Sequence, residues 1–247
     1  MKYITHSGMY HADDIMSVAL LILVFGYHKV IRTNSLNDVD IKDDDIIFDI
    51  GGGKFDHHQD GSEIRENGVP YAAFGLLFRE FSKQLGLHPW AAELMDKEFI
   101  QMFDLTDNYG QVKHPNTLSA LVSASFKAGR SFEEVVEIVF PLLEDIVSSY
   151  KELSDQRREV ESSIDDSTSV FNGKSRHYDG RVFEGTTVKF VIGPSLRGPG
   201  VVLRSLDSTT FPIKDVDGVE PLFLHKGRFT ATYSCEEDAL KAANASL

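Results

Sequence analysis

The sequence is poor in cysteine, in long hydrophobic runs and in positive charge, and each shortage excludes a class of protein. Its 247 residues include one cysteine, Cys235, which excludes a disulfide framework and predicts a reducing compartment, the cytoplasm. The longest apolar run, VALLILVF at 18–25, is too short to cross a bilayer, which takes about 20 residues. The N-terminal MKYITHSGMYH lacks the basic, apolar and small-residue zones of a secretory signal. We therefore expect a protein with no membrane partner.

Positive charge is scarce over the whole chain but not over every part of it. Lys and Arg number 25 against 38 Asp and Glu, a net charge of −13, which argues against a nucleic-acid binder with a broad basic footprint. Between Lys174 and Arg228, however, nine basic residues face six acidic ones, a net of +3, and the remainder carries −16. Bound divalent cations would add further positive charge locally. A nucleic-acid partner is therefore not excluded.

The first 50 residues alternate between strand-like and helix-like patterns. KYITH at 2–6, HKVIRT at 28–33 and IIFDI at 46–50 are short and rich in β-branched residues, as buried strands are. ADDIMSVALLILVFG at 12–26 has apolar residues at helical spacing and acidic residues in its first turn, where the helix dipole favours them. Strand, helix, strand, crossover and strand in this order are typical of an α/β fold with a parallel sheet.

The pattern turns helical at residue 70 and changes again near residue 165. We expect helices at 70–86, 89–110, 117–129 and 131–164. Pro141 is expected to kink the last of them. Polar, turn-rich sequence follows, then short β-like runs and a closing helix, CEEDALKAANASL. The predicted fold is α/β, with a mostly parallel, doubly wound sheet and its helices in residues 1–165 and a smaller α+β domain in residues 166–247.

Histidines and carboxylates gather where the predicted strands end. Five of the nine histidines lie in the first 58 residues, and four of those five follow strand ends with carboxylates nearby. Because ligands bind beyond the carboxyl ends of parallel strands, we expect His6, His11, Asp13 and Asp49 at one edge of the sheet. Imidazole with carboxylate suits Mn²⁺, Mg²⁺, Fe²⁺ or Zn²⁺ in an open catalytic site. A carboxylate between two clusters can bridge two ions about 3.5–4 Å apart, an arrangement used for phosphoester hydrolysis.

Four segments carry a resemblance to a known family. They are HSGMYHADD, IIFDIGG, KFDHHQ and DLTDNYG, which contain Thr5-His6, His11-Ala12-Asp13-Asp14, Asp49-Ile50-Gly51-Gly52, Phe55 to Gln59, and Asp107-Asn108-Tyr109-Gly110. With Arg32-Thr33 they resemble the signature segments of the DHH phosphoesterase superfamily, most closely its melanocyte-proliferating-gene-type (Myg-type) branch of metal-dependent hydrolases or RNA exonucleases. The tail LFLHKGRFTATYSCEEDALKAA is similar to the closing segment of that branch. PYAAFG departs from the branch's usual serine-serine-alanine-glycine helix start.

The resemblance implies a metal-dependent 3′–5′ exonuclease acting on RNA or short oligonucleotides through two divalent ions, Mn²⁺ first and Mg²⁺ as the alternative. The implied metal ligands are His6, His11, Asp13, Asp49, His57, Asp104 and Asp107. His58, Asp49 and His57 would be catalytic, with Asp49 bridging the ions and His58 contacting phosphate or donating a proton. Asp104 and Asp107 lie three residues apart on one predicted helix, so both can face the site and the choice between them stays open.

The predicted C-terminal domain offers basic side chains to a substrate. Arg197, Arg204, His225 and Arg228 are candidate substrate contacts, because an arginine fork fits phosphate oxygens bidentately. His225 is equally well a strand-end histidine. The remaining histidines are expected to be structural or surface residues: His28, His88, His114 and His177.

Two other functions fit the same residues. One is a small-molecule phosphatase, pyrophosphatase or cyclic-dinucleotide phosphodiesterase on the same core. The other is a metal-stabilised binding protein without turnover. The sequence leaves the metal, the preference for RNA or DNA, and a homodimer open.

Overall fold

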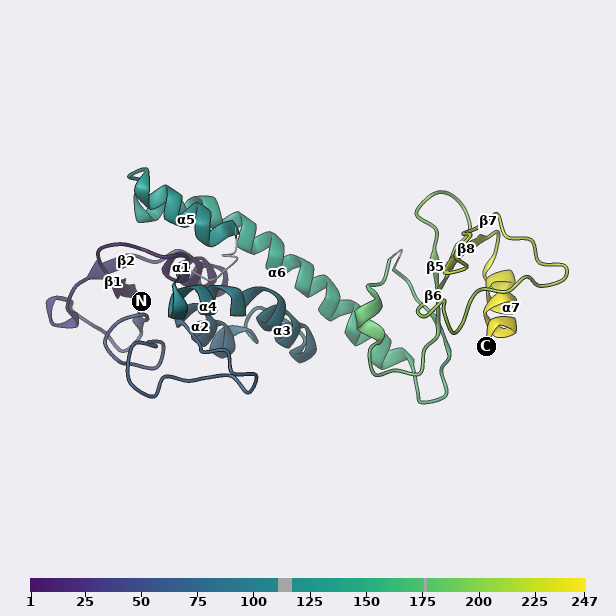
Figure 1. The fold of residues 1–247 in the computed structure, drawn as a ribbon, viewed down its shortest axis with the longest axis horizontal. Coiled ribbons are helices and arrows are strands. Elements are labelled where there is room, and N and C mark those ends of the chain that lie inside the picture. Colours follow the sequence, from purple (N-terminus) through teal and green to yellow (C-terminus); the bar gives the residue numbers. More distant parts are fainter. Residues whose placement is uncertain (111–116, 176) are drawn as a thin grey trace. The chain divides into compact units, whose positions relative to one another are not determined.

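The computed structural model describes residues 1–110, 117–175 and 177–247, and its internal contacts divide the chain into two compact units (Figure 1). Unit 1 is Met1–Lys151 and unit 2 is Glu152–Leu247. The division falls inside helix α6, Phe132–Ser163, which runs on through Pro141. The predicted boundary after residue 165 lies beyond the end of that helix.

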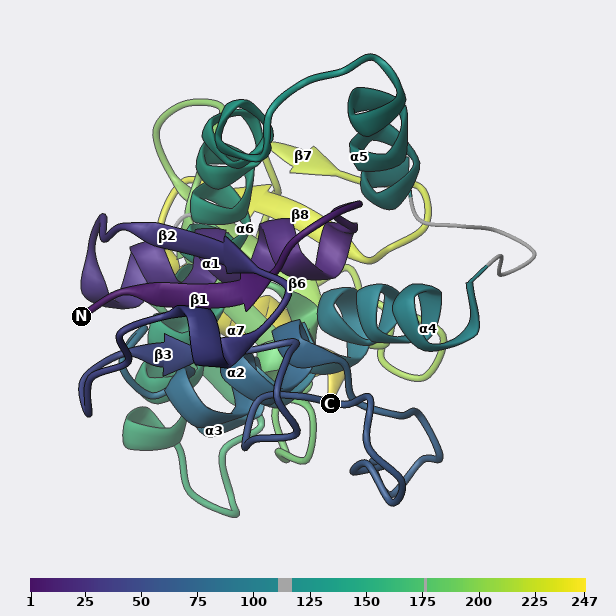
Figure 2. The same ribbon diagram turned by 90° about the vertical axis from the view of Figure 1, so that its left-hand side faces the viewer.

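Unit 1 contains a parallel three-stranded sheet. Its strands are β1 (Tyr3–His6), β2 (Val30–Thr33) and β3 (Ile46–Ile47), in the order β2-β1-β3. Figure 2 shows β1 between its two neighbours. Helix α1 (Ala12–Phe25) connects β1 to β2, and a short 3₁₀ turn, η1 (Leu36–Asp38), precedes β3. The mixed α/β class with a parallel sheet is confirmed, whereas a doubly wound arrangement stays a prediction.

β3 is shorter than the five residues expected at 46–50. Asp49 has a φ of 56°, in the left-handed region that no strand residue adopts. Phe48 still donates its N–H to the carbonyl of Ile4 at 3.0 Å, and its side chain is fully buried. The chain therefore leaves the sheet at Asp49, and it does so abruptly.

Helices fill the rest of unit 1. They are α2 (Ala73–Phe81), α3 (Pro89–Met95), the π-helical segment η2 (Asp96–Ile100), α4 (Gln101–Tyr109), α5 (Thr117–Lys127) and the first part of α6. The single helix expected at 89–110 is thus three consecutive segments, because η2 widens the winding in its middle. α1 packs against α2, α4 and α5. Its residues Ala12 to Ile22 are all buried, as expected for a helix that is covered on every side.

Unit 2 contains a five-stranded sheet, a helix packed on that sheet and the last part of α6. The strands are β4 (Val170–Asn172), β5 (Phe190–Pro194), β6 (Val201–Ser205), β7 (Phe223–Leu224) and β8 (Thr230–Tyr233), in the order β4-β5-β6-β8-β7. Only the β4–β5 pair is parallel. A 3₁₀ turn, η3 (Gly180–Phe183), precedes β5, and α7 (Glu236–Ser246) packs on β5, β6 and β8.

The core of unit 2 follows from alternation along its strands. Phe190 and Ile192 of β5 and Leu203 of β6 are fully buried, and α7 meets them with Ala239 and Ala243. Small alanines let the helix backbone approach the sheet closely, and each buried large apolar side chain contributes roughly 1.5–3 kcal/mol. Across the part of the chain that the structure describes, no helix combines the length and the apolar content of a membrane span.

Candidate metal centre

The carboxyl edge of the sheet in unit 1 carries a cluster of imidazoles and carboxylates. His6 is the last residue of β1, and Asp49 follows the neighbouring strand β3. Because these strands are parallel, both side chains leave the sheet at the same edge, and His6 Nε2 lies 3.2 Å from Asp49 Oδ2. Asp14, in the first turn of α1, places both carboxylate oxygens 3.1 Å from the same nitrogen. His6 is thus held between two carboxylates.

A glycine-rich turn carries Asp49 and brings the chain back over this edge. The left-handed φ of 56° at Asp49 is strained for a residue with a side chain, at roughly 1–3 kcal/mol. Gly51 and Gly52, at 89° and 69°, adopt the same region freely. The loop closes where the Asp49 N–H donates to the Phe55 carbonyl at 2.9 Å. This closure returns the chain so that His57 Nδ1 lies 3.4 Å from Asp49 Oδ1.

The two adjacent histidines have different surroundings. His57 is 8% exposed, and its Nε2 lies 3.0 Å from Asp107 Oδ2. The His58 side chain is 61% exposed, and its Nδ1 lies 2.8 Å from Asp56 Oδ1. Their rings stand 4.3 Å apart between centroids, tilted by 30°. His57 therefore faces the buried carboxylates, whereas His58 presents one ring nitrogen outward.

The N-terminus of α2 fixes one carboxylate of the cluster. Asp13 Oδ1 accepts the Phe74 N–H at 2.9 Å, and Asp104 Oδ1 accepts the Gly75 N–H at 3.1 Å. Ala72, the residue before the helix, has no side-chain group that can cap the helix. These two carboxylates therefore accept from free N–H groups of its first turn. A Cβ at Gly75 would lie 2.0 Å from Asp104 Oδ2, which excludes a larger residue there. The PYAAFG turn thus contributes backbone donors where the family pattern has hydroxyls.

Asp104 and Asp107 have separate roles in the structure. Asp104 is fully buried, and its Oδ2 accepts from Arg65 Nη2 at 2.6 Å. Asp96 accepts from the same Nη2 at 2.6 Å and from Nε of that guanidinium at 2.9 Å. Asp107, one turn further along α4, lies instead against the histidines, with His11 Nδ1 at 3.6 Å. The structure therefore brings Asp107 to the donor cluster and pairs Asp104 with Arg65.

Three groups of donors emerge, two of which share His57, and the ligand atoms of each group lie within 4.8 Å of one another. They are His6, His11 and Asp14; Asp13, His57 and Asp107; and Asp49, Asp56, His57 and His58. Asp14 and Asp56 were not among the predicted ligands, although both stand inside the motifs HADD and FDHHQ. Acidic residues directly beside a chosen ligand were the signal that could have identified them.

Three buried atoms of this cluster have no hydrogen-bond partner among the described residues: Asp13 Oδ2, Asp49 Oδ1 and His57 Nδ1. A buried polar atom left without a partner costs about 1–3 kcal/mol. Such atoms on neighbouring side chains are accounted for if they bind a cation. Mixed imidazole and carboxylate donors fit Mn²⁺, Mg²⁺ or Zn²⁺, so the residues present fit a divalent ion.

Electrostatics at the sheet edge favour bound positive charge. Hydrogen bonds to Asp14 and Asp49 raise the pKa of His6 to about 11. Burial raises the pKa of Asp49 to about 6, although the hydrogen bond with His6 works against it. Burial acts in the same direction on Asp14, but the hydrogen bond and charge of His6 outweigh it and lower the pKa of that carboxyl. The cluster therefore retains a proton on His6 that a metal ion would displace.

In the second donor group, Asp13, His57 and Asp107, burial and neighbouring charges also shift pKa values. Burial raises the pKa of Asp13 well above its ordinary value, and the charges of Asp107 and Asp49 add to this effect. For His57, burial lowers the pKa, but the hydrogen bond to Asp107 and the charge of Asp49 raise it overall. Several carboxylates share a small volume with little water, and a divalent cation relieves their repulsion.

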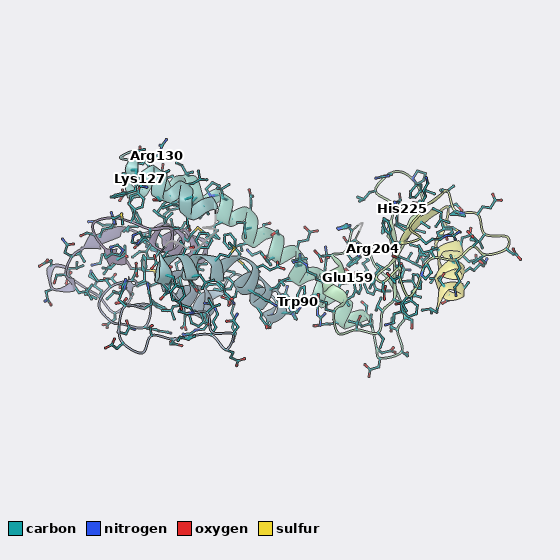
Figure 3. The ribbon with its side chains drawn as sticks, viewed as in Figure 1. Trp90, Lys127, Arg130, Glu159, Arg204 and His225 are labelled. Atoms are coloured by element: carbon teal, nitrogen blue, oxygen red, sulfur yellow. The ribbon has the colours of Figure 1, made fainter. Side chains whose placement is uncertain are left out.

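The four predicted substrate contacts all lie in unit 2, where Figure 3 labels Arg204 and His225. Arg204 donates to the Tyr178 carbonyl at 2.5 Å, and burial lowers the pKa of its guanidinium. Arg228 pairs with Asp215 at 2.8 Å.

The other two are less engaged by their neighbours. His225 Nδ1 accepts the Gly227 N–H at 3.0 Å, and Arg197 is exposed in the loop between β5 and β6. Arg197 is therefore the most accessible of the four candidates.

Histidines outside the cluster have structural surroundings. His28 is exposed with its ring against Tyr3, and His88 accepts the Trp90 N–H at the start of α3. His177 is exposed in unit 2, and His114 lies outside the described residues.

Two sequence comparisons relate this chain to MYG1 proteins. The sequence model of the MYG1_exonuc family, an uncharacterised protein family (UPF0160), matches residues 2–175, a span that includes every donor of the cluster. Over 166 residues the chain is 29% identical to MYG1 protein C694.04c of Schizosaccharomyces pombe. The matched region covers 57% of this chain and 48% of that protein. The chain thus spans about half the length of this curated relative.

Among solved structures, the pGpG-specific phosphodiesterase PggH from Vibrio cholerae aligns over 99% of this chain and 96% of its own, with 14% sequence identity and a TM-score of 0.30. A score at this level does not establish a shared fold.

Proposed function

The chain belongs to the MYG1_exonuc family, and from this premise we propose that it is a metal-dependent phosphoesterase that shortens RNA or short oligonucleotides from the 3′ end. The observation that carries the proposal is the set of three neighbouring donor groups, in which three buried ligand atoms make no hydrogen bond to the described residues. The family's name contains the activity class, and the donor set is of the kind that phosphoester hydrolysis requires.

Two ions would be held by different parts of the cluster. His6, His11 and Asp14 form one group, and Asp13, His57 and Asp107 form the other. Asp49 contacts both groups, through His6 at 3.2 Å and His57 at 3.4 Å, which is where a bridging ligand would stand. When bound, divalent ions of this kind polarise a phosphoester and lower the pKa of the attacking water. Mn²⁺ is proposed first, with Mg²⁺ as the alternative.

His58 is the residue to which we assign proton transfer. Asp56 accepts hydrogen bonds from the N–H groups of Gly52 and His58 as well as the contact from His58 Nδ1. Although burial acts against it, these bonds lower the pKa of the Asp56 carboxyl, so it stays ionised and can only accept. In neutral His58 the proton therefore stands on Nδ1, and Nε2 is left outward to exchange a proton with a phosphate or a leaving oxygen.

We propose Arg197 and His225 of unit 2 as substrate contacts, since they offer cationic or hydrogen-bonding groups to phosphate. Arg204 and Arg228 stay proposed contacts, although each already binds a partner within unit 2. The cytoplasmic location and a homodimer likewise stay predictions.

The test is Mn²⁺-dependent hydrolysis of a 5′-labelled short RNA, with pyrophosphate and a cyclic dinucleotide as competing candidate substrates. We expect stepwise shortening of the RNA, abolished by chelation and by His57→Ala. His28→Ala is the matched control, because His28 is exposed and outside the cluster. Full turnover by His57→Ala, with its fold verified by circular dichroism, would overturn the proposal.

Preference for pyrophosphate or the cyclic dinucleotide would favour the small-molecule reading of the same site. Chelation that unfolds the protein, without any hydrolysis in its metal-loaded form, would favour a metal-stabilised binding protein.

A further inference from the structure

A cavity of about 420 Å³ opens directly beside the donor cluster. His11, Asp13 and Asp107 form one of its walls, and all three belong to the donor groups described above. The other walls are largely apolar and include the rings of Tyr10, Phe103 and Phe126. The volume lies in the range of small-molecule sites, roughly 300–1,000 Å³. An apolar cavity with metal donors on one side is built for a ligand that has one charged end and one apolar end.

The Tyr10 wall is held in place by its own contacts. Its hydroxyl donates to the Arg130 carbonyl at 2.9 Å. Its ring meets Phe126 edge-on at 5.2 Å and Phe132 edge-on at 5.7 Å. The side chain is 3% exposed, so its position is fixed before a ligand binds and only a small part of it is open to the cavity.

The Phe103 wall is equally fixed. Its ring is buried and stands edge-on to Phe74, 5.5 Å away between centroids. Phe103 lies one turn before Asp107 on α4, so a single helix presents both an aromatic wall and a metal donor. The backbone N–H of Phe74 in turn binds Asp13. The apolar wall and the donors therefore share supports and keep a fixed spacing.

The α5 side of the cavity is accessible and carries positive charge. Ser123 and Lys127 line it from α5, and both are exposed. Figure 3 labels Lys127 and, close to it, Arg130 in the turn that leads into α6. An ammonium group at this side can donate hydrogen bonds to ring nitrogens or carbonyl oxygens of a bound heterocycle. It also offsets some of the acidic charge on the opposite wall.

We propose that this cavity binds the base of the terminal nucleotide while that nucleotide's phosphate lies on the metal centre. The proposal rests on the proposed function and adds to it which part of the nucleotide binds outside the metal centre, namely the base. A base is flat and aromatic, so it suits the Phe126 ring, which is 36% exposed, and the apolar walls to which the buried Tyr10 and Phe103 contribute, whichever base it is. A bare sugar would place its hydroxyls against those rings without partners, and inorganic phosphate would leave the apolar walls empty.

Equilibrium binding separates these ligands without requiring turnover. The Mn²⁺-loaded protein is titrated with adenosine 5′-monophosphate, uridine 5′-monophosphate and ribose 5-phosphate, which share the phosphate and differ in the base. We expect both nucleotides to bind about tenfold or more tightly than ribose 5-phosphate. Equal affinities for the three ligands would overturn the proposal.

Ser123→Phe tests the location, because it fills the cavity from an exposed helix position that holds no donor. It should reduce nucleotide affinity to that of ribose 5-phosphate and leave ribose 5-phosphate and Mn²⁺ binding unchanged. Leu121→Phe is the matched control, since Leu121 is 58% exposed on the same helix and does not line the cavity. Phe126→Ala, which removes a wall, should weaken nucleotide binding several-fold. Nucleotide affinities that are unchanged in both Ser123→Phe and Phe126→Ala would overturn the proposal.

The outcome distinguishes this inference from the function on which it rests. Hydrolysis of an abasic oligonucleotide as fast as of RNA would overturn the base pocket and leave the phosphoesterase standing. Tight, base-dependent nucleotide binding without hydrolysis of any substrate would support the pocket and overturn the phosphoesterase.

Discussion

The two units differ in whether they bury charged side chains. In unit 1, five carboxylates are almost completely buried: Asp13, Asp14, Asp49, Asp56 and Asp104. In unit 2, the buried polar side chains of the described residues are Ser154, Gln156, Ser205 and Ser246, none of them charged. Its carboxylates pair nearer to the surface, as Asp179 does with Arg181.

Burying an ionised carboxylate without a partner costs several kcal/mol, so a chain retains such groups where something binds them. Asp104 has a permanently charged partner within the chain, Arg65, whereas Asp14 and Asp56 contact the imidazoles of His6 and His58. Asp13 Oδ2 and Asp49 Oδ1 accept no hydrogen bond from the described residues. Unit 1 therefore retains buried charges that reduce its stability and that a cation could bind. Unit 2 buries no charged side chain among its described residues.

The largest expected effect comes from a donor in unit 1. Asp107→Asn should reduce Mn²⁺-dependent hydrolysis about 10³-fold, equivalent to about 4 kcal/mol of activation free energy. The metal-free variant should be as stable as the parent or more stable, because the charge that raises the pKa of Asp13 is removed. Turnover with Mn²⁺ and urea unfolding in chelator measure the two quantities. A clear loss of stability in the metal-free variant would show that Asp107 stabilises the fold, and it would contradict the view that the donors of unit 1 reduce its stability.

The next effect separates Asp104 from Asp107. Arg65→Met should reduce the free energy of unfolding of unit 1 by about 3 kcal/mol, because it leaves Asp104 buried without its cation. Burial already raises the pKa of Asp104 to about 7, so the destabilisation should be larger at pH 8 than at pH 6, where the carboxyl takes up a proton. Urea unfolding at both pH values provides the measurement. The same loss at both would contradict the assignment of the charge to Asp104.

Metal affinity should depend on pH in the direction that proton displacement requires. His6 is protonated below its pKa of about 11, and Asp49 below about 6, so a metal ion must displace at least one proton. Apparent Mn²⁺ affinity should therefore rise with pH, by about tenfold per unit for one displaced proton. Calorimetry in two buffers of different ionisation enthalpy counts the released protons. An affinity that stays constant between pH 6 and 8 would contradict the cluster as described.

The smallest effect is expected in unit 2. Asp179→Asn removes a charge that is paired with Arg181 at 2.8 Å and partly exposed. Surface pairs contribute about 0–1 kcal/mol, and asparagine can still accept the Arg181 N–H that Asp179 accepts now. We expect a change below about 1 kcal/mol in urea unfolding and no change in Mn²⁺ affinity. A loss as large as that of Arg65→Met would remove the contrast between the units.

Several elements could be predicted from the sequence because their signals are local. The parallel β1 and β2 with α1 between them follow from β-branched runs around one apolar helix. The sharp turn after β3 follows from three consecutive glycines. The interruption of the 89–110 helix by η2 was not predicted, because π-helical winding leaves the apolar spacing almost unchanged.

What the sequence by itself determined is the chemistry of the centre: which residue types gather, and that they follow strand ends. Only the tertiary structure decided which partner each buried charge contacts. Asp104 and Asp107 are equivalent by helical spacing, and the choice between them depends on Arg65, 39 positions away from Asp104. The walls of the cavity come from separate helices for the same reason. Periodicity and turn chemistry act over a few residues, but the partner of a buried charge is set by packing between segments that are distant in sequence.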